Sequence, residues 1–492
     1  MSLGLDPLID CILDPGSRVS WDAPMSDPPP TDAYIMSLRR ARVRTGRDES
    51  VLTCEGTIRG RRVAVIGGDP EFLGGSIGVA AGERLTCAIE RATAERLPIV
   101  ALPVGGGTRM QEGTVAFLQM VKITSAVMAH KREHLPYLVY LRDPTMGGVF
   151  ASWGSLGQVT LAEPGALVGF LGPRVYKAIY GQPFPAGVQL SDNLAERGVI
   201  DRVLPPEALA EELARILEVV CSRPTGYEQH ESQAPARLRE WDAWDSITRT
   251  RRDDRPGLRD LLEVAAQDVT MLNGTGDGET HPGQVLALAR WGNAPSVVVG
   301  QDRSDQGRPL DPAALREVRR GIRLAKELDL PLVSVIDTPG AALSKEAEER
   351  GLASEIARTL SELLSLRTPT VSLLLGQGTG GIALALAPAD RVVCSEHAWL
   401  SPLPPEGASA IVHRDTAHAA DLARAQGVRS ADLMAAGIVD RIVPEPDDLV
   451  AGRQEFCAEL GRVLHDAVLR VIAMPADRRL QARRERFRTL GW

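Results

Sequence analysis

Two pairs of adjacent glycines are the positions in this sequence best suited to chemistry performed by the backbone itself. Gly147 and Gly148 follow the apolar segment 138–141, and Gly380 and Gly381 follow a second apolar segment. Adjacent glycines let the main chain approach a ligand because no Cβ intervenes. If a helix begins at such a turn, its first N–H groups have no partner inside the helix and can point at an oxygen atom. We therefore predict that these four glycines are catalytic and that each pair belongs to an oxyanion hole.

Further glycine-rich segments follow strands expected in the same two halves of the chain. Ligands of doubly wound sheets gather beyond the carboxyl ends of the strands, so these segments are expected to form the walls of the substrate site. The residues predicted to bind substrate on this basis are Gly74, Gly75, Ser76, Gly106, Gly107, Thr108 and Arg109 in the first half, and Pro339, Gly340 and Ala341 in the second.

A dinucleotide-binding motif competes with this interpretation in the second half. Residues 376–381 fit G-x-G-x-x-G after a strand, and Glu396 follows 20 residues after Gly376, as in a nicotinamide site. However, the helix expected between Gly381 and Pro388 is short for a nucleotide-binding crossover, and the first half keeps its glycine pair without the fingerprint. The feature that both halves share is the pair of backbone donors.

A serine-hydrolase motif competes in the first half. Residues 74–78 fit G-x-S-x-G, the nucleophile elbow, which requires an apolar strand directly before the serine. Here the segment 69–72, Asp-Pro-Glu-Phe, intervenes. We therefore expect a glycine loop that covers a ligand.

The chain is predicted to be an internal duplication. Landmarks recur in the same order and at nearly the same separation, which indicates a repeated domain. The matched positions are Pro98 and Pro331 (331 − 98 = 233), Gly147 and Gly380 (380 − 147 = 233), and the phrases at 198–205 and 437–444 (437 − 198 = 239).

Strands alternate with helices in both halves, which is typical of α/β layering. At 492 residues the chain is too long for one ordinary core. Residues 221–257 lose the periodicity, so the predicted domains are 1–225 and 226–492. The helix expected at 352–364, with Leu352, Ile356, Leu360, Leu363 and Leu364 beside Ala353 and Ala357, is interpreted as core.

Composition excludes several functional classes. The formal charge of −8 argues against nucleic acid as a partner, although an Arg-rich helix at 39–44 could meet phosphates or simply form a solvated face. Six single cysteines without C-x-x-C fit a reducing cytoplasm and argue against a zinc ribbon or another metal site of this kind. The N-terminal residues do not resemble a signal peptide, and no apolar run suits a membrane span. We expect a cytoplasmic protein.

In these glycine-rich segments and their order, the chain resembles the carboxyltransferase of acetyl-CoA carboxylase. Residues 50–205 look like its β subunit and residues 330–446 like its α subunit, so the chain resembles a β–α fusion. The segments that carry the resemblance are 72–78, 106–112, 143–149 and 163–175 in the first half, and 336–341, 347–351, 405–411 and 442–446 in the second.

The resemblance implies a crotonase-like fold in each half and carboxyl transfer from carboxybiotin to the α-carbon of an acyl-CoA. It implies one oxyanion hole for the thioester enolate and one for the biotin ureido oxygen, near the two glycine pairs, without saying which hole takes which oxygen. It adds Phe170 and Gly172 to the substrate-binding residues. Because the β-like half of one chain and the α-like half of a partner share a site in this family, a homo-oligomer of at least two chains is also implied.

The sequence departs from the family pattern in two places. The β subunit's zinc ribbon is absent, and residues 341–346 read Ala-Ala-Leu-Ser-Lys-Glu where glycines are usual. Lys122 lies in a segment that only roughly resembles a biotinyl site and has a helical pattern, so carboxybiotin must come from a separate biotin carrier or biotin carboxylase subunit. A decarboxylase or transcarboxylase with the same enolate chemistry, and an inactive scaffold subunit, remain as alternatives.

Overall fold

The computed structural model describes residues 3–24, 31–224, 239–305 and 309–490. The chain forms two compact units, unit 1 with Met1–Arg215 and Gly276–Gly278, and unit 2 with Ile216–Thr275 and Glu279–Trp492. This division falls inside helix α9 (Pro206–Val220). The boundary predicted between residues 225 and 226 lies outside the described residues and stays a prediction.

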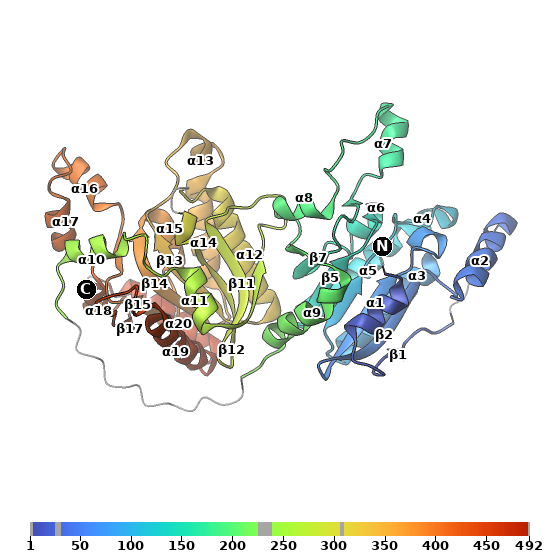
Figure 1. The fold of residues 1–492 in the computed structure, drawn as a ribbon, viewed down its shortest axis with the longest axis horizontal. Helices are drawn as coiled ribbons and strands as arrows, with labels where there is room; N and C mark the ends of the chain where they lie inside the picture. Colours follow the sequence, from blue (N-terminus) through green and yellow to red (C-terminus); the bar gives the residue numbers. More distant parts are fainter. Residues whose placement is uncertain (1–2, 25–30, 225–238, 306–308, 491–492) are drawn as a thin grey trace. The chain divides into compact units, whose positions relative to one another are not determined.

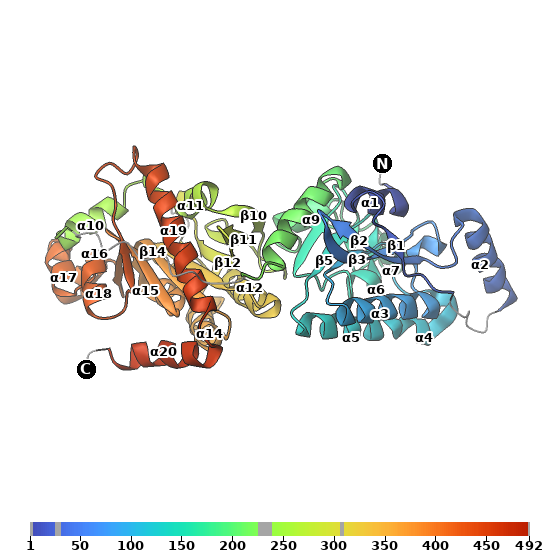
Figure 2. The ribbon, with the colours of Figure 1, turned by 90° about the horizontal axis from the view of Figure 1, so that it is seen from below.

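Unit 1 is built on a seven-stranded sheet with helices on both faces (Figures 1 and 2). The strands β3, β4, β5, β7 and β9 are parallel, and β2 joins β3 as an antiparallel hairpin. In spatial order the strands are β1 (Val19–Ser20), β2 (Val51–Ile58), β3 (Arg61–Gly68), β4 (Ile99–Leu102), β5 (Tyr137–Leu141), β7 (Val159–Ala162) and β9 (Arg202–Val203).

The central parallel strands β4 and β5 of unit 1 are continuous, buried apolar runs because both of their faces are covered. Helices α3 (Val79–Ala94) and α5 (Gln119–Arg132) lie side by side along one face (Figure 2). Helix α1 (Leu5–Ile12) packs on β3, where the Leu5 side chain would be 2.6 Å from a Cβ at Gly67. The expected helix at 39–44 is part of α2 (Asp32–Thr45).

Unit 2 repeats this architecture. Its main path of seven strands begins with the antiparallel β10, β11 and β12 and continues in parallel from β12 to β17. Helices α11 (Leu258–Ala265) and α19 (Arg453–Ile472) form a core with one face. In spatial order the strands are β10 (Gln267–Leu272), β11 (Gln284–Trp291), β12 (Ala294–Gln301), β13 (Leu332–Thr338), β14 (Thr370–Thr379), β15 (Arg391–Ser395) and β17 (Arg441–Val443), with β16 (Trp399–Ser401) beside β14.

The duplication extends to the register of the strands. Ala64 is paired with Ile99 in unit 1, and Val297 with Leu332 in unit 2. Both members are shifted by the same number, since 297 − 64 = 233 and 332 − 99 = 233. The offset found in the sequence therefore describes equivalent positions in two sheets.

A second, smaller layer of pairing lies beyond the carboxyl ends of the parallel strands. In unit 1 it contains the bridge between Ile77 and Thr108 and the pair of strands β6 (Thr145–Met146) and β8 (Val168–Gly169). In unit 2 Leu310 is bridged to Ala341. Each of these residues lies 233 positions after its counterpart in unit 1, since 310 − 77 = 233 and 341 − 108 = 233. The predicted glycine segments belong to this layer.

Two local predictions are wrong. The segment 221–257, interpreted as aperiodic, contains helix α10 (Ala243–Thr250), whose Ala243 and Ile247 are buried against Trp399. In the second half, the glycine turn expected from Gly376 begins only at Gly380, because β14 continues to Thr379. Helix α10 was missed because only Ala243 and Ile247 on it belong to the apolar cluster, and two apolar residues do not make a recognisable helical pattern.

Helix α14 (Leu352–Ser365) is only partly core. Its buried face carries Leu352 and Leu363 but also Glu355 and Thr359. Glu355 is buried because Arg316 and Arg319 of α12 (Pro312–Leu328) and Arg358 pair with it. Of the predicted apolar stripe, Ala353 and Ala357 are exposed, and Ile356, Leu360 and Leu364 are half-buried.

Candidate active site

The first glycine pair begins a helix at the end of the small layer of unit 1. Strand β6 runs directly into α6 (Gly147–Phe150). Gly147 has φ 56°, and a Cβ there would lie 2.6 Å from the carbonyl oxygen of Gly106. Gly148 is less restricted, because the nearest atom to its Cβ position is Met120 Cγ at 3.7 Å. The N–H groups of this first turn have no partner within α6.

Three of the predicted segments meet here, backbone against backbone. A Cβ on Gly107 would stand 2.8 Å from the nitrogen of Gly148, and one on Gly105 would stand 2.5 Å from the oxygen of Gly75. Main-chain hydrogen bonds join the same segments: Gly107 accepts from Ile77 N at 2.9 Å, and Gly105 O accepts from Met146 N at 2.9 Å. The glycines are therefore required for approach between loops.

Phe170 and Gly172 follow the partner strand β8. The Phe170 side chain is 69% exposed, and its carbonyl oxygen would lie 3.8 Å from a Cβ on Gly147. Gly172 precedes α7 (Pro173–Tyr180) in an extended conformation and has no close neighbour beyond Val175. Phe170 thus presents an apolar ring to solvent next to the first glycine turn.

The second glycine pair has the equivalent place in unit 2. Helix α15 (Gly380–Leu386) begins at Gly380, which has φ 72°. Gly340, with φ 130°, lies beside it, since a Cβ there would be 3.6 Å from Thr379 Cγ2. Gly381 faces Ile356 of α14, whose Cδ1 would be 2.7 Å from an added Cβ. The segment from Pro339 to Ala341 therefore runs beside this turn.

Arg109 has its guanidinium turned into the protein. Its side chain is 1% exposed and pairs with Glu49 and, at 3.3 Å, with Glu112. It also donates to the carbonyl oxygen of Ser76 at 2.9 Å. Burial alone would lower the pKa of Arg109, but the hydrogen bond and charge of Glu49 outweigh it and raise that pKa, so the group stays charged. The side chain ties two glycine segments together and leaves only the backbone of Arg109 for a ligand.

The same ion cluster explains the last glycine of the G-x-S-x-G motif. Glu112 accepts from the N–H of Val79 at 2.5 Å at the start of α3 and from the hydroxyl of Tyr34. A Cβ on Gly78 would lie 2.3 Å from a carboxylate oxygen of Glu112. The Ser76 hydroxyl donates to Leu73 O at 2.9 Å. The motif is thus accounted for by packing, without a nucleophile.

Sequence reasoning missed Glu49 and Tyr34 as members of this cluster. Both are far from Arg109 in the sequence, and no spacing signal connects them. Glu112 could have been found, because it lies three residues after Arg109 in a segment already singled out.

The glycines of the G-x-G-x-x-G motif also have a packing role. Gly376 and Gly378 are strand residues of β14. A Cβ on Gly376 would be 2.3 Å from Asp337 Oδ1, and one on Gly378 would be 2.7 Å from the carbonyl oxygen of Trp399. A dinucleotide site needs these glycines in a turn, so the structure gives the nicotinamide alternative no support.

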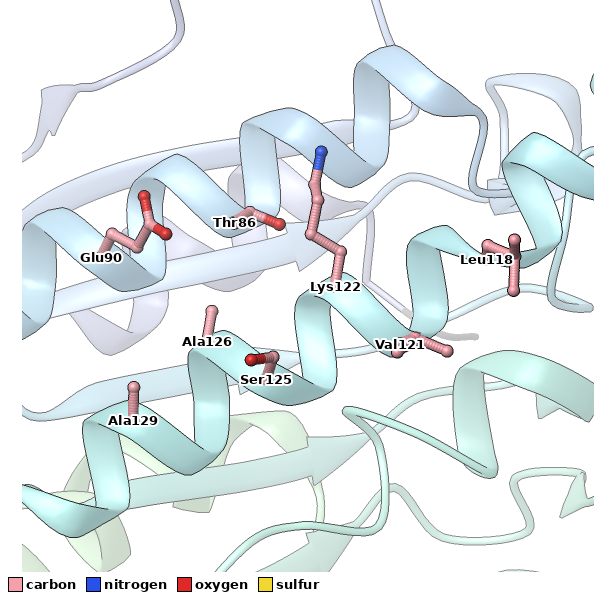
Figure 3. Close-up of a pocket in the computed structure, with 8 residues that line it drawn as sticks. All are labelled: Thr86, Glu90, Leu118, Val121, Lys122, Ser125, Ala126 and Ala129. Carbon is pink, nitrogen blue, oxygen red and sulfur yellow. The ribbon is translucent and has the colours of Figure 1, made fainter.

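A surface groove between α3 and α5 does not include the glycine turns (Figure 3). Lys122 lies within α5, as its helical pattern predicted, and pairs with Glu83 of α3. The groove is lined by Thr86, Glu90, Leu118, Val121, Lys122, Ser125, Ala126 and Ala129.

Among the residues that the structure describes, no group of three or more His, Cys, Asp or Glu side chains is placed to hold a metal ion. Within the same ranges, every helix is too short or too polar to cross a bilayer.

Comparison with known proteins gives a consistent result. A family model described as "Carboxyl transferase domain" matches residues 33–479. The chain is 56% identical to the "Probable biotin-dependent acyl-coenzyme A carboxylase beta3 subunit" of Mycobacterium tuberculosis, over 99% of this chain and 98% of that protein. It is 38% identical to the "Acetyl-coenzyme A carboxylase carboxyl transferase subunits beta/alpha" of Salinispora arenicola, over 98% of this chain and 89% of that protein.

Solved structures show the same fold. The transcarboxylase 12S structure, a hexamer with methylmalonyl-coenzyme A bound, has a TM-score of 0.75 at 19% identity and covers 96% of this chain and 90% of its own. A single-chain, multi-domain long-chain acyl-CoA carboxylase has a TM-score of 0.73 at 18% identity and covers 93% of this chain and 45% of its own. The predicted class, α/β with two tandem crotonase-like domains, is confirmed.

The two members of the first glycine pair should respond differently to a methyl group. Gly147→Ala places a side chain at positive φ, which costs at least about 1 kcal/mol, and drives it into Gly106 O. Gly148→Ala meets Met120, Gly107 and Thr108 at 3.7–3.8 Å, which is ordinary contact distance. We expect Gly147→Ala to lower the melting temperature clearly and Gly148→Ala to leave it near the parental value, as measured by calorimetry. Equal melting temperatures would contradict the close approach of the loops.

Proposed function

The chain belongs to the carboxyl transferase family of biotin-dependent acyl-CoA carboxylases, and from this premise we propose that it moves a carboxyl group from carboxybiotin to the α-carbon of an acyl-CoA. The proposed substrates are of the acetyl- or propionyl-CoA class, and the products malonyl- or methylmalonyl-CoA. Such a step would serve fatty acid biosynthesis, in the cytoplasm.

The observation that supports this mechanism is the repeated glycine turn. Gly147 and Gly380 each begin a helix at positive φ, at the same place in two equivalent sheets. The proposed reaction has two oxygens that gain negative charge, the thioester oxygen of the enolate and the ureido oxygen of biotin. Backbone N–H groups held in advance at such oxygens stabilise the transition state without any charged side chain. One turn for each oxygen fits this requirement.

The proposed step also needs little from side chains. Cleavage of the N–carboxyl bond of carboxybiotin releases CO₂ and leaves a ureido anion that can accept the α-proton. The enolate then forms a carbon–carbon bond with CO₂. The site has to stabilise these anions and exclude water, so we assign Gly147, Gly148, Gly380 and Gly381 as its catalytic donors.

The remaining predicted residues become walls of the proposed site. The backbones of Gly106 and Gly107 contact the first turn, those of Gly74 and Gly75 contact Gly105 beside it, and Gly340 borders the second turn. At the second turn the nearest atom to a Cβ on Gly380 is Pro402 O at 3.7 Å. We propose that biotin arrives on a separate carrier subunit.

An exchange assay tests the proposed function. The purified protein is incubated with malonyl-CoA or methylmalonyl-CoA, with and without free biotin, and loss of the carboxyl group is followed by chromatography of the CoA products. We expect loss that depends on biotin. Loss without biotin would indicate a decarboxylase, and no reaction with either substrate would indicate a scaffold subunit, so either result contradicts the proposal.

The assembly gives a second test. If the first half of one chain and the second half of another share each site, a monomer cannot be active. Light scattering at assay concentration should then show at least a dimer, which we expect to have two-fold symmetry. An active monomer would rule out a shared site.

Bulky substitutions in the glycine pairs test the donors. Gly148→Val and Gly381→Val should push the oxygen away from the N–H groups, and loss of one such donor costs about 3 kcal/mol, or about 10²-fold in turnover. A Cβ on Gly148 would have no neighbour closer than 3.7 Å, and the nearest atom to a Cβ on Gly381 is Cδ1 of Ile356, the end of a side chain that can move, so we expect both variants to fold.

The two variants, Gly148→Val and Gly381→Val, should also differ in which substrate they affect. One should impair acyl-CoA turnover while biotin affinity persists, and the other should do the reverse. Folded variants with near-parental turnover would show that these glycines are only turn residues.

A further inference from the structure

Strand β14 departs from its neighbour β13 just before the second glycine turn. Ile336 is paired with Leu374, but the next pair is Thr338 with Gly378. One residue of β13 therefore faces three residues of β14, a bulge of two extra residues. Every residue of β14 is buried. A bulge leaves main-chain groups without ladder partners, and buried polar groups need other partners.

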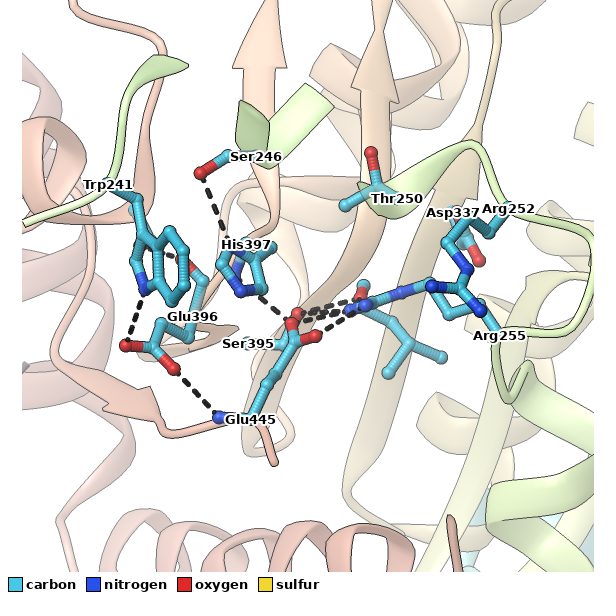
Figure 4. Close-up of polar contacts among 12 residues, drawn as sticks. Trp241, Ser246, Thr250, Arg252, Arg255, Asp337, Ser395, Glu396, His397 and Glu445 are labelled. Atoms are coloured by element: carbon cyan, nitrogen blue, oxygen red, sulfur yellow. Dashed lines mark hydrogen bonds and ion pairs between the residues drawn. The ribbon is translucent and has the colours of Figure 1, made fainter. Parts of the chain in front are cut away.

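Side chains supply those partners. Within the bulge, the N–H of Gln377 donates to Asp337 Oδ1 at 2.9 Å. The carbonyl oxygen of Leu375 accepts from the Arg255 guanidinium at 2.9 Å and from the Ser395 hydroxyl at 2.7 Å. Gly376 lies between these two residues, and any Cβ on it would collide with the Asp337 carboxylate. The bulge is thus held from both sides, and Figure 4 shows Arg255 and Asp337, one from each side.

The side chains of Asp337 and Arg255 are fully buried and held by further contacts. Asp337 Oδ2 accepts from Arg303 at 2.7 Å, and Arg255 donates to Glu445 at 2.6 Å. Glu445 is fixed in turn by the N–H of His397 at 3.1 Å. Figure 4 shows these contacts converging from separate segments of unit 2. A buried ion pair is weak evidence for stability because desolvation offsets its attraction, so a geometric role is the better explanation.

We propose that Asp337 and Arg255 are positioning residues, which hold the β14 bulge so that the N–H groups at Gly380 and Gly381 face the reacting oxygen. Two residues separate Gln377 from Gly380, so a shift of the bulge moves the turn directly. Both side chains are buried and therefore not open to a ligand. This arrangement is found in unit 2 and not in unit 1, because the residue of unit 1 that corresponds to Asp337 is Val104 (337 − 233 = 104). The inference rests on the proposed function for its catalytic readout.

The chain offers a matched control at the other end of the same strand. Asp390 Oδ2 accepts from the N–H of Thr370, the first residue of β14, at 2.9 Å. Like Asp337, it is buried and paired with an arginine, Arg483, at 2.8 Å. Asp390→Asn therefore replaces a comparable buried carboxyl group that contacts the start of β14, far along the strand from the glycine turn.

The experiment compares Asp337→Asn with Asp390→Asn in the full-length protein. Turnover and KM for malonyl-CoA and free biotin are measured, together with amide hydrogen exchange of residues 376–386. We expect Asp337→Asn to reduce kcat by about 10²-fold, as for a lost oxyanion donor, with little change in either KM and with faster exchange across the turn. Asp390→Asn should lower the melting temperature and leave kcat and exchange at the turn near parental values.

Parental kcat and parental exchange in Asp337→Asn would overturn the inference, as would an equal fall of kcat in both variants. If Asp337→Asn does not fold, Arg303→Lys keeps the positive charge but not its fixed geometry, and should lower kcat in the same direction by a smaller factor. If the unsubstituted protein itself shows no carboxyl transfer, the proposed function is refuted instead. The exchange comparison would then decide the positioning role by itself.

Discussion

Backbone segments approach each other in the small layer of unit 1 more closely than any side chain would allow, and the candidate site depends on this contact. The loops around Gly75, Gly105, Gly107 and Gly147 touch through main-chain atoms, with Cβ positions 2.5–3.0 Å from backbone atoms of a neighbouring loop. A buried parallel sheet sets the starting points of these loops, and hydrogen bonds such as Gly105 N to Pro144 O at 2.7 Å join them. These contacts hold the N–H groups of the turn, which we propose as donors, in place, as electrostatic stabilisation by such groups requires.

The two units reach the same turn by different means. In unit 1 the loops support one another, and the buried cluster of Arg109 with Glu49 and Glu112 ties them to α2 and α3. In unit 2 a bulged strand carries the turn, and Asp337 and Arg255 occupy its freed backbone groups. The two units thus share the strand register and the glycine pairs. The buried ionisable residues near the two turns differ, with Arg109, Glu49 and Glu112 in unit 1 and Asp337 and Arg255 in unit 2.

Much of this arrangement could be predicted from the sequence because glycine and apolar runs are local signals. The offset of 233, the two glycine pairs that begin helices and the alternation of strands with helices were all predicted from residue types and spacing. The inward direction of Arg109 could not be predicted, since it depends on Glu49 and Tyr34, which other segments bring to it. The full length of β14 was missed because Gly376 and Gly378 suggest a turn, whereas they leave space for Asp337 and for Trp399 O. Glu355 interrupted the apolar face predicted for α14 because its arginine partners lie partly on another helix.

The altered segment 341–346 does not remove the second turn. Gly340 keeps φ 130°, and Ala342 N donates to Leu310 O at 2.8 Å, so the start of the segment stays in the small layer. The substituted residues build something local instead: Ser344 caps α13 (Lys345–Glu349) by accepting from Ala347 N at 3.1 Å. Leu343, just before this cap, is 96% exposed. The departure from the family pattern therefore changes the surface next to the turn and leaves in place the backbone of the turn at Gly380, on which the proposed reaction depends.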